Sequence, residues 1–243
     1  MKHTTTNFYV PPNEIQNGRV SFPKDESNHL SRVLRAETGD IVRIIDGVGN
    51  AYEVEIVRSD PDYSRGKILK GIDSAPEPSL RYTLAVGTIN PRRLESAWDS
   101  CVQLGISSLI PMWTSFSTDR LRPDGKYIDR LHTVSKRAMK QSGRAVLPEV
   151  QEPVSLVELL KRGRFEYIFY GEPDGLPNPP QKTTLLSHSV LLMIGPEGGF
   201  SSEEIRLLED CSAIPISLGP RRLRSETAMI VLSIIALRWS GDI

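Results

Sequence analysis

A glycine-rich loop in the last fifth of the chain holds residues that could bind a ligand. The stretch "LLMIGPEGGFSSEEI" (191–205) is an apolar run, then a turn, then the start of a helix. Gly195, Gly198 and Gly199 have no side chain, so a ligand can approach the backbone closely. Glu197 would repel a phosphate, so the loop suits an uncharged nucleoside or a ligand with an ammonium group. A tight strand-to-helix turn with a solvated glutamate is the alternative interpretation.

A second loop, "ISLGPRRLRSETAMI" (216–230), again follows a strand-like run and precedes a helix. Its three arginines come just before the predicted N-cap Ser225, with Glu226 in the first turn; they are Arg221, Arg222 and Arg224. Cations at a helix N-terminus oppose the helix dipole, so an anion should face them. An RNA phosphate or a developing oxyanion would serve, and pairing with Glu197 and Glu226 is the alternative.

The elements that must position these loops alternate between strand and helix. Strands are predicted over 81–89, 107–113, 166–171, 189–195 and 213–219, and helices over 92–105, 126–143, 155–163, 202–210 and 225–239. This alternation indicates an α/β domain with a parallel sheet and helices on both faces. Ligands of such sheets bind beyond the carboxyl ends of the strands, where both loops lie.

The first part of the chain has a different rhythm. Strands are predicted over 40–47, 50–59 and 65–72, and one helix over 25–40 should place Leu30, Val33 and Leu34 on one face. Short strands with one helix favour a small β-barrel. The segment "DSAPEPS" (73–79) has the composition of a linker.

The composition excludes some classes of protein. Formal net charge is zero, so any nucleic-acid surface must be local. The two cysteines, Cys101 and Cys211, are expected to be small buried residues in a reducing compartment. We see no metal-binding cluster, no signal peptide and no apolar run long enough for a membrane span. A soluble cytoplasmic protein is therefore expected.

Taken together, "IGPEGGFSSEE" and "SLGPRRLRSETA" closely resemble the RsmE family of the SPOUT superfamily. The segments "NHLSRVLRAETGD" and "DGVGNAYEVEI" are similar to its N-terminal PUA-like barrel, and "QLGISSLIP" and "KQSGRAVLPEV" match further segments. These bacterial enzymes methylate N3 of a uridine in small-subunit (16S) ribosomal RNA with S-adenosylmethionine. The chain departs from the family pattern at Ser100, Gln103, Lys140 and Ser225.

The resemblance implies a PUA-like RNA-binding barrel over 1–73, a linker over 74–79 and a SPOUT methyltransferase domain with a trefoil knot over 80–243. It also implies a cytoplasmic homodimer that needs no metal and acts on 16S rRNA, either free or in the small ribosomal subunit. The residues implied to bind the cofactor are Tyr170, Gly171, Ile194, Gly195, Glu197, Gly198, Gly199, Leu218, Gly219, Leu223, Ser225, Thr227 and Ala228.

The chemistry of the acceptor suggests catalytic residues. N3 of uracil must lose a proton, and negative charge then spreads onto the two ring oxygens. Arg224 is the candidate to stabilise this charge; Glu226 could accept the proton, orient Arg224, or only face the helix dipole. Candidate RNA contacts are Arg32, Arg35, Lys136, Arg137, Lys140, Arg144, Arg221 and Arg222.

Two other functions of the same fold stay open. One is a SPOUT methyltransferase acting on tRNA ribose, and the other is an RNA-binding relative without catalytic activity. A nucleotide hydrolase is disfavoured, because the sequence has no Walker-type Gly-Lys-Ser/Thr loop.

Overall fold

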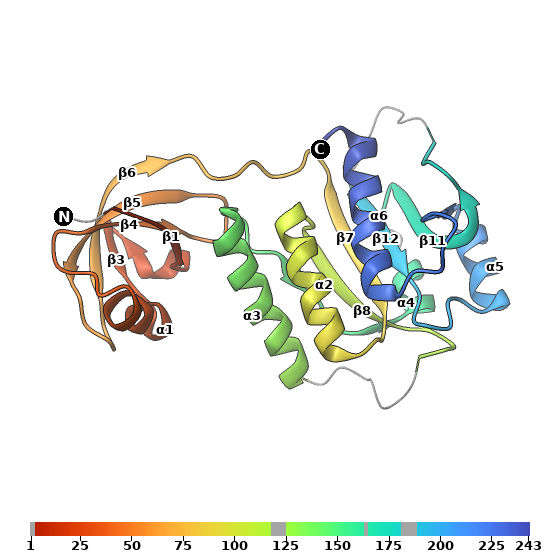
Figure 1. The fold of residues 1–243 in the computed structure, drawn as a ribbon, viewed down its shortest axis with the longest axis horizontal. Helices are drawn as coiled ribbons and strands as arrows, with labels where there is room; N and C mark the ends of the chain where they lie inside the picture. Colours follow the sequence, from red (N-terminus) through yellow and green to blue (C-terminus); the bar gives the residue numbers. More distant parts are fainter. Residues whose placement is uncertain (1–2, 118–124, 163–164, 181–188) are drawn as a thin grey trace. The chain divides into compact units, whose positions relative to one another are not determined.

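The chain folds into two compact units in a computed structural model that describes residues 3–117, 125–162, 165–180 and 189–243 (Figure 1). The first unit comprises Met1–Glu77 together with Lys136–Leu147, and the second comprises Pro78–Ser135 and Pro148–Ile243. The C-terminal part of helix α3 (Gly125–Ser142) therefore packs with the first unit.

The first unit is built around a six-stranded curled sheet in the order β1-β4-β5-β6-β3-β2. The strands are β1 (His3–Tyr9), β2 (Ile15–Gln16), β3 (Arg19–Ser21), β4 (Ile41–Ile45), β5 (Ala51–Arg58) and β6 (Arg65–Ile72). β1 runs parallel to β4, and the other neighbours are antiparallel. A 3-10 turn (Pro12–Glu14) precedes β2. The inner face carries a closed apolar core, in which Phe8 packs edge-on against Phe22.

The helix expected over 25–40 is shorter and less regular than predicted. Helix α1 (Lys24–Asn28) passes directly into a π-helical turn, His29–Val33, where Leu34 N–H bonds to the His29 carbonyl. The wider turn changes the angular spacing of the side chains. Leu30 is buried as predicted, but Val33 is 65% exposed, so its predicted place on the core face is wrong.

The second unit contains a parallel sheet in the order β10-β8-β7-β12-β11-β13, with β9 beside β8. Its strands are β7 (Arg81–Gly87), β8 (Ser108–Trp113), β9 (Glu149–Val150), β10 (Val154–Ser155), β11 (Tyr167–Leu176), β12 (Ser189–Ile194) and β13 (Ile214–Ile216). The predicted α/β architecture with a parallel sheet is confirmed.

Helices cover this sheet. α4 (Leu156–Lys161) and α5 (Ser202–Asp210) pack against the sheet through Leu156, Leu159 and Leu208. α2 (Pro91–Leu104) and α6 (Ser225–Ser240) lie side by side in front of it in Figure 1. Trp98 of α2 is fully buried, and its indole N–H donates to Ser135 Oγ.

Local signals fix where these helices begin and end. Asn90 caps α2 by accepting a bond from Arg92 N–H, and Gly105 ends it at a φ of 110°. Ser201 and Glu204 form a capping box at the start of α5. Of the two cysteines, Cys101 is buried as expected, whereas Cys211 is exposed at the end of α5, which corrects that expectation.

Candidate active site

The two glycine loops predicted from the sequence meet at the carboxyl end of the sheet. The loop after β12 and the loop after β13 are joined by two hydrogen bonds. Ser225 Oγ donates to the Gly195 carbonyl at 3.0 Å, and Arg222 Nη2 donates to the Glu197 carbonyl at 3.0 Å. Ser225 was predicted to be the N-cap of the last helix, but Arg224 occupies that position without a side-chain bond. The Ser225 hydroxyl instead bonds the neighbouring loop, which explains the difference.

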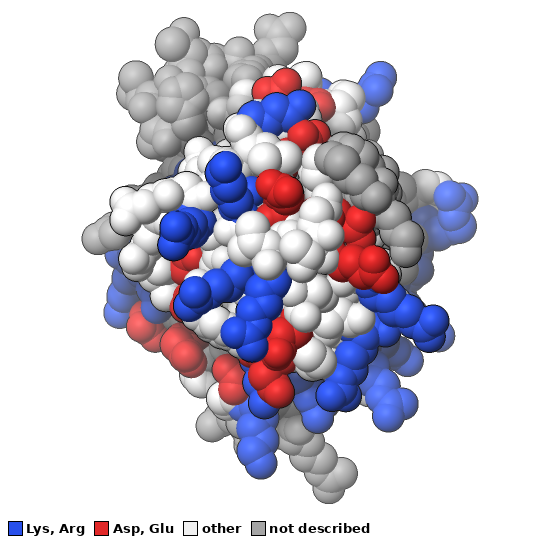
Figure 2. Space-filling view, turned by 90° about the vertical axis from the view of Figure 1, so that its left-hand side faces the viewer, with Lys and Arg blue, Asp and Glu red and all other residues white. Residues whose placement is uncertain are grey.

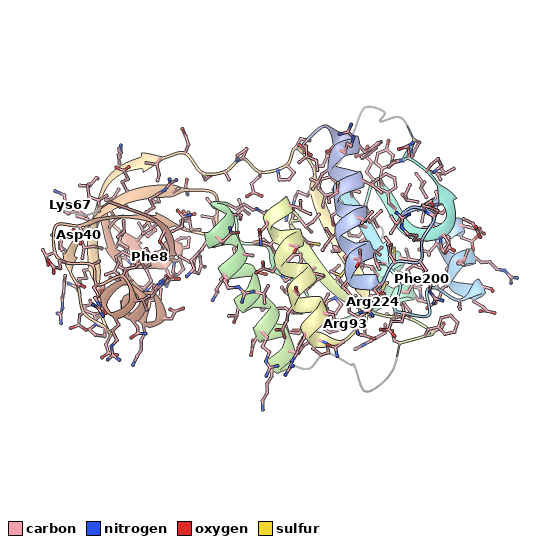
Figure 3. The ribbon with its side chains drawn as sticks, in the orientation of Figure 1. Phe8, Asp40, Lys67, Arg93, Phe200 and Arg224 are labelled. Atoms are coloured by element: carbon pink, nitrogen blue, oxygen red, sulfur yellow. The ribbon has the colours of Figure 1, made fainter. Side chains whose placement is uncertain are left out.

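A cavity of about 610 Å³ lies between these loops and the end of β11. It is lined by every residue predicted to bind the cofactor except Tyr170 and Thr227. Tyr170 is 2% exposed and packs edge-on against Phe200, which itself lines the cavity (labelled in Figure 3). Tyr170 thus supports the wall from behind, whereas the side chain of Thr227 is exposed on α6.

Several lining residues were not predicted from the sequence. They come from the end of β11 and from apolar positions of the loops and α5: Glu172, Pro173, Asp174, Pro196, Phe200, Ile205 and Pro220. Glu172, Pro173 and Asp174 could have been predicted from the sequence, because "GEPDG" follows a buried strand run whose carboxyl end lies at the same edge of the sheet. The Arg221 and Arg222 side chains, predicted to contact RNA, also line this cavity.

Glycine is required where the backbone segments touch. A Cβ on Gly195 would lie 2.8 Å from the carbonyl carbon of Gly199, inside the same loop. A Cβ on Gly87, at the end of β7, would lie 2.4 Å from the Pro196 ring. Both glycines therefore allow the first loop to fold tightly over the sheet edge.

Three acidic residues, Glu172, Asp174 and Glu197, line this cavity together with the exposed Arg221 and Arg222. Burial, and secondarily the nearby Asp174, raise the pKa of Glu172 above its usual value. Glu197 is exposed on the opposite loop. Carboxylates at these positions disfavour a phosphate and favour a ligand that carries positive charge.

A second cavity of about 410 Å³ shares a wall with the first. Pro196, Glu197, Arg222, Leu223 and Ser225 line both, and Arg93 and Arg224 line only the second. In Figure 3, Arg93 and Arg224 lie near each other at the N-terminal ends of α2 and α6. Arg93 was not predicted as a site residue.

The charged groups of the second cavity form a network. Arg93 Nη1 lies 3.1 Å from Glu197 Oε1, and Arg93 Nε lies 3.7 Å from Glu226 Oε1. Arg224 Nη1 is 4.0 Å from the same Glu226 oxygen. The Arg224 side chain is 71% exposed, while Glu226 is 20% exposed. Glu226 therefore lies between two guanidinium groups, and Arg224 keeps most of its donors available.

The remaining residues predicted to contact RNA divide into two groups. Arg32, Arg35, Lys136 and Arg137 are exposed. Lys140 forms an ion pair with the buried Glu26, and Arg144 is 2% exposed with its Nε 2.9 Å from Glu77 Oε1. The prediction that Arg144 contacts a phosphate is therefore wrong: its guanidinium is used inside the first unit. The Lys140 ammonium is likewise engaged by Glu26.

Within the described ranges, no group of three or more His, Cys, Asp or Glu side chains could hold a metal ion. The helices described in the structure include none that is both long and apolar enough to cross a membrane.

Each of the two units contains a match to a known protein family. The family described as RNA methyltransferase domain matches residues 76–237, and the RNA methyltransferase PUA domain matches residues 22–69. The chain belongs to the RNA methyltransferase family.

Individual relatives narrow the comparison. A protein of Mesomycoplasma hyopneumoniae is 28% identical over 232 residues, covering 93% of this chain and 96% of that protein. A protein of Rickettsia conorii is 27% identical, covering 97% of this chain and 96% of its own length. Both are named ribosomal RNA small subunit methyltransferase E. The resemblance to the RsmE family is thereby confirmed.

Solved structures agree with this fold. A Legionella pneumophila protein, assigned provisionally as a methyltransferase, contains bound S-adenosylmethionine; it is 27% identical with a TM-score of 0.81. The match covers 97% of this chain and 98% of that one. A probable rRNA-methyltransferase from Porphyromonas gingivalis is 26% identical with a TM-score of 0.81, covering 98% of this chain and 99% of that one.

Proposed function

We propose that this protein transfers a methyl group from S-adenosylmethionine to N3 of a uridine in small-subunit ribosomal RNA. The observation that carries the proposal is the shared wall between two cavities of different character. The first is lined by glycine backbone, by carboxylates and by the exposed Arg221 and Arg222, and the second adds Arg93 and Arg224 to the shared Arg222. The names of the relatives support the same reaction class.

The first cavity fits S-adenosylmethionine. This ligand has a nucleoside, an amino-acid tail and a sulfonium, and no phosphate. The backbone of Gly171, Gly195 and Gly219 lines the cavity without side chains, while Leu218 and Phe200 add apolar surface for an adenine ring. Glu172 and Asp174 offer carboxylates to a cationic group. When bound, the sulfonium supplies the methyl group and its leaving sulfur.

The second cavity suits the uracil ring. N3 must lose its proton before or while it bonds to the methyl carbon and the carbon–sulfur bond breaks. Loss of the proton places negative charge on the ring oxygens until the methyl bond has formed, and guanidinium groups aimed at them stabilise that charge. Arg224 and Arg93 are the residues in this role. Glu226, held between them, either accepts the proton or keeps both guanidiniums in place.

The target base must leave any base pair before it reacts, because N3 of paired uracil faces its partner. Contacts to the RNA backbone then position the nucleotide. We assign this role to the exposed cations Arg32, Arg35, Lys136, Arg137, Arg221 and Arg222.

Further properties follow from the family resemblance and are part of the proposal. Residues 1–73 would form the RNA-binding domain, and residues 80–243 the catalytic domain with a trefoil knot. The proposal also includes a homodimer in the cytoplasm that acts on 16S rRNA or on the small ribosomal subunit. Ile234 on α6 is 39% exposed and offers apolar surface for the dimer contact.

The test is methyl transfer in vitro. Purified protein, S-adenosylmethionine and transcribed 16S rRNA are incubated, and the digested nucleosides are analysed by mass spectrometry. N3-methyluridine at one position is the expected product. Methylation of ribose would support the alternative tRNA-type activity if tRNA were also accepted, and cofactor-independent RNA binding alone would indicate an inactive relative.

A further inference from the structure

The first unit carries a basic groove that the sequence motifs did not indicate. It has a volume of about 870 Å³ and lies between the turn before β2, strand β3 and strand β6. We call it the β3–β6 groove. Its charged lining residues are Arg19, Arg65, Lys67 and a single acid, Glu14. Figure 2 shows one face of the molecule, on which Lys and Arg side chains occur in several groups with Asp and Glu side chains among them.

The register of the strands brings the cations together. Arg19 of β3 is the direct partner of Lys67 of β6, and Ser21 is the partner of Arg65. Side chains alternate along a strand, so Arg65 and Lys67 share the outer face, while the Gly66 between them is buried. Lys67 is labelled in Figure 3. The Arg19 and Lys67 side chains thus stand next to each other on the same face.

The pairing of Arg19 with Lys67 is unfavourable for the protein alone. Like charges directly opposite each other in a sheet destabilise it. Glu55 of β5 faces Lys67 from the other side. Among the ion pairs of the described residues, however, none involves Arg19, Arg65 or Lys67. Arg65 instead packs on the ring of Tyr63, 4.6 Å from its centroid.

Neutral hydrogen-bonding groups surround the cations. Asn13, Gln16 and Asn17 line the groove beside them, and Asn17 has a positive φ of 51° in the tight turn between β2 and β3. Cations with amide side chains are the groups that contact phosphates and sugars in nucleic-acid complexes. No apolar pocket for a single base is present among the lining residues, where only Val20 and Val57 are apolar.

We propose that the β3–β6 groove binds the phosphate backbone of the substrate RNA outside the target nucleotide, with Arg19 and Lys67 as its main contacts. This inference rests on the proposed function for the identity of the RNA. It places a phosphate contact of the first unit on a face formed by β3 and β6, in addition to Arg32 in the π-helical turn and Arg35 just after it.

The test measures how RNA binding depends on salt. Arg19→Gln, Lys67→Gln and the double variant are compared with Lys70→Gln, a charge loss on the same strand at a residue paired with Glu53. Binding is measured with transcribed 16S rRNA and with an unrelated RNA of equal length. Each lost phosphate contact should reduce the slope of log K against log salt by about 0.7 to 0.9.

The double variant should therefore lose about 1.4 to 1.8 from the slope with both RNAs, while Lys70→Gln leaves it unchanged. Because Arg19 faces Lys67 on one side and the neutral Gln16 on the other, Arg19→Gln should melt no lower than the wild type. An unchanged slope in the double variant would overturn the proposal. S-adenosylmethionine affinity, measured by calorimetry, should be the same in all variants. If the wild type bound no cofactor, the proposed function would fail, while the salt measurement would still decide the groove.

Discussion

Arg93 and Glu197 form an ion pair of 3.1 Å between the first turn of α2 and the first glycine loop. They are 104 residues apart in the sequence, and the pair closes one side of the second cavity. The same Arg93 lies 3.7 Å from Glu226 at the start of α6. The Arg93 guanidinium thus connects α2 to the first glycine loop and to Glu226, which lies between Arg93 and Arg224.

Arg93 provides the first prediction. Arg93→Ala should lower kcat for methyl transfer about 100-fold, since loss of one donor to a developing oxyanion costs two to three orders of magnitude at most. Cofactor affinity should change little, because Arg93 does not line the first cavity. Arg92→Ala is the matched control: Arg92 is the exposed neighbour and should keep the wild-type rate. A wild-type kcat for Arg93→Ala would remove it from the site.

Arg224 should show its role in the pH dependence of the rate. In Arg224→Ala the uracil anion loses a stabilising charge, so proton loss from N3 becomes harder. We expect kcat to fall about 100-fold at neutral pH and to keep rising to a higher pH than in the wild type. Arg224→Lys should recover part of the rate. A pH–rate curve that is lowered uniformly without a shift would argue that Arg224 acts only in binding RNA.

The sequence predicts the parts of this site that are formed by neighbouring residues, but not the contacts between residues far apart along the chain. The two glycine loops were predictable because each is a local pattern of strand, glycine-proline and helix. Arg93 was missed because its neighbours are set by the sheet order, in which β7 lies between β8 and β12. No periodicity near residue 93 indicates that α2 begins beside α6.

The sequence also did not reveal which single charged residues are buried. Arg144 follows a glycine in a family segment and was interpreted as an RNA contact, yet it pairs with Glu77 inside the first unit. Val33 shows the same limit for apolar residues, because a π-helical turn is not visible in the spacing of side-chain types. The alternating helices and strands of the second unit depended on a stronger pattern and were largely predictable.

Gly195→Ala tests the tight packing of the first loop. The new methyl group would lie 2.8 Å from the Gly199 carbonyl carbon, so the loop must open. We expect a loss of about 1 to 3 kcal/mol in the free energy of unfolding and a cofactor affinity reduced at least about tenfold, since 1.4 kcal/mol of lost binding suffices. Gly125→Ala, where no atom lies within 4 Å of the new Cβ, is the control. Unchanged calorimetric binding in Gly195→Ala would contradict the packing argument.

Cofactor binding should weaken in acid because of Glu172. Its pKa is raised by burial and by Asp174, so it takes up a proton at a higher pH than an ordinary glutamate. The charged form attracts a cationic ligand; affinity should therefore be full at neutral pH and decrease as the pH falls through the raised pKa. Glu172→Gln should bind more weakly at neutral pH and lose most of this dependence. Titrations of both proteins at several pH values check the prediction, which fails if their profiles are parallel.

Lys140 should stabilise the first unit through Glu26. Lys140→Ala leaves a buried carboxylate unpaired, which we expect to cost about 1 to 3 kcal/mol at neutral pH, less than a fully buried pair because Lys140 is partly exposed. Burial raises the pKa of Glu26 although Lys140 opposes the shift. A carboxyl group whose pKa is raised by folding stabilises the folded state at low pH, and this stabilisation is lost as the pH rises. In acid Glu26 takes up a proton and no longer needs a cationic partner, so the destabilisation caused by Lys140→Ala should be smaller.

Denaturant unfolding at neutral and acidic pH measures this difference. Lys24→Ala is the control, since Lys24 and Asp62 are both highly exposed and their pair should contribute less than about 1 kcal/mol. Equal penalties for Lys140→Ala at both pH values would contradict the role given to Glu26.

The central claim is that the glycine loops hold the methyl donor so that it faces the arginine cavity. A crystal structure with bound S-adenosylmethionine tests this most directly. We predict the nucleoside between the loops after β12 and β13, with its methyl group directed toward the space between Arg93 and Arg224. Density for the cofactor at another place, or a methyl group directed away from both arginines, would contradict the account.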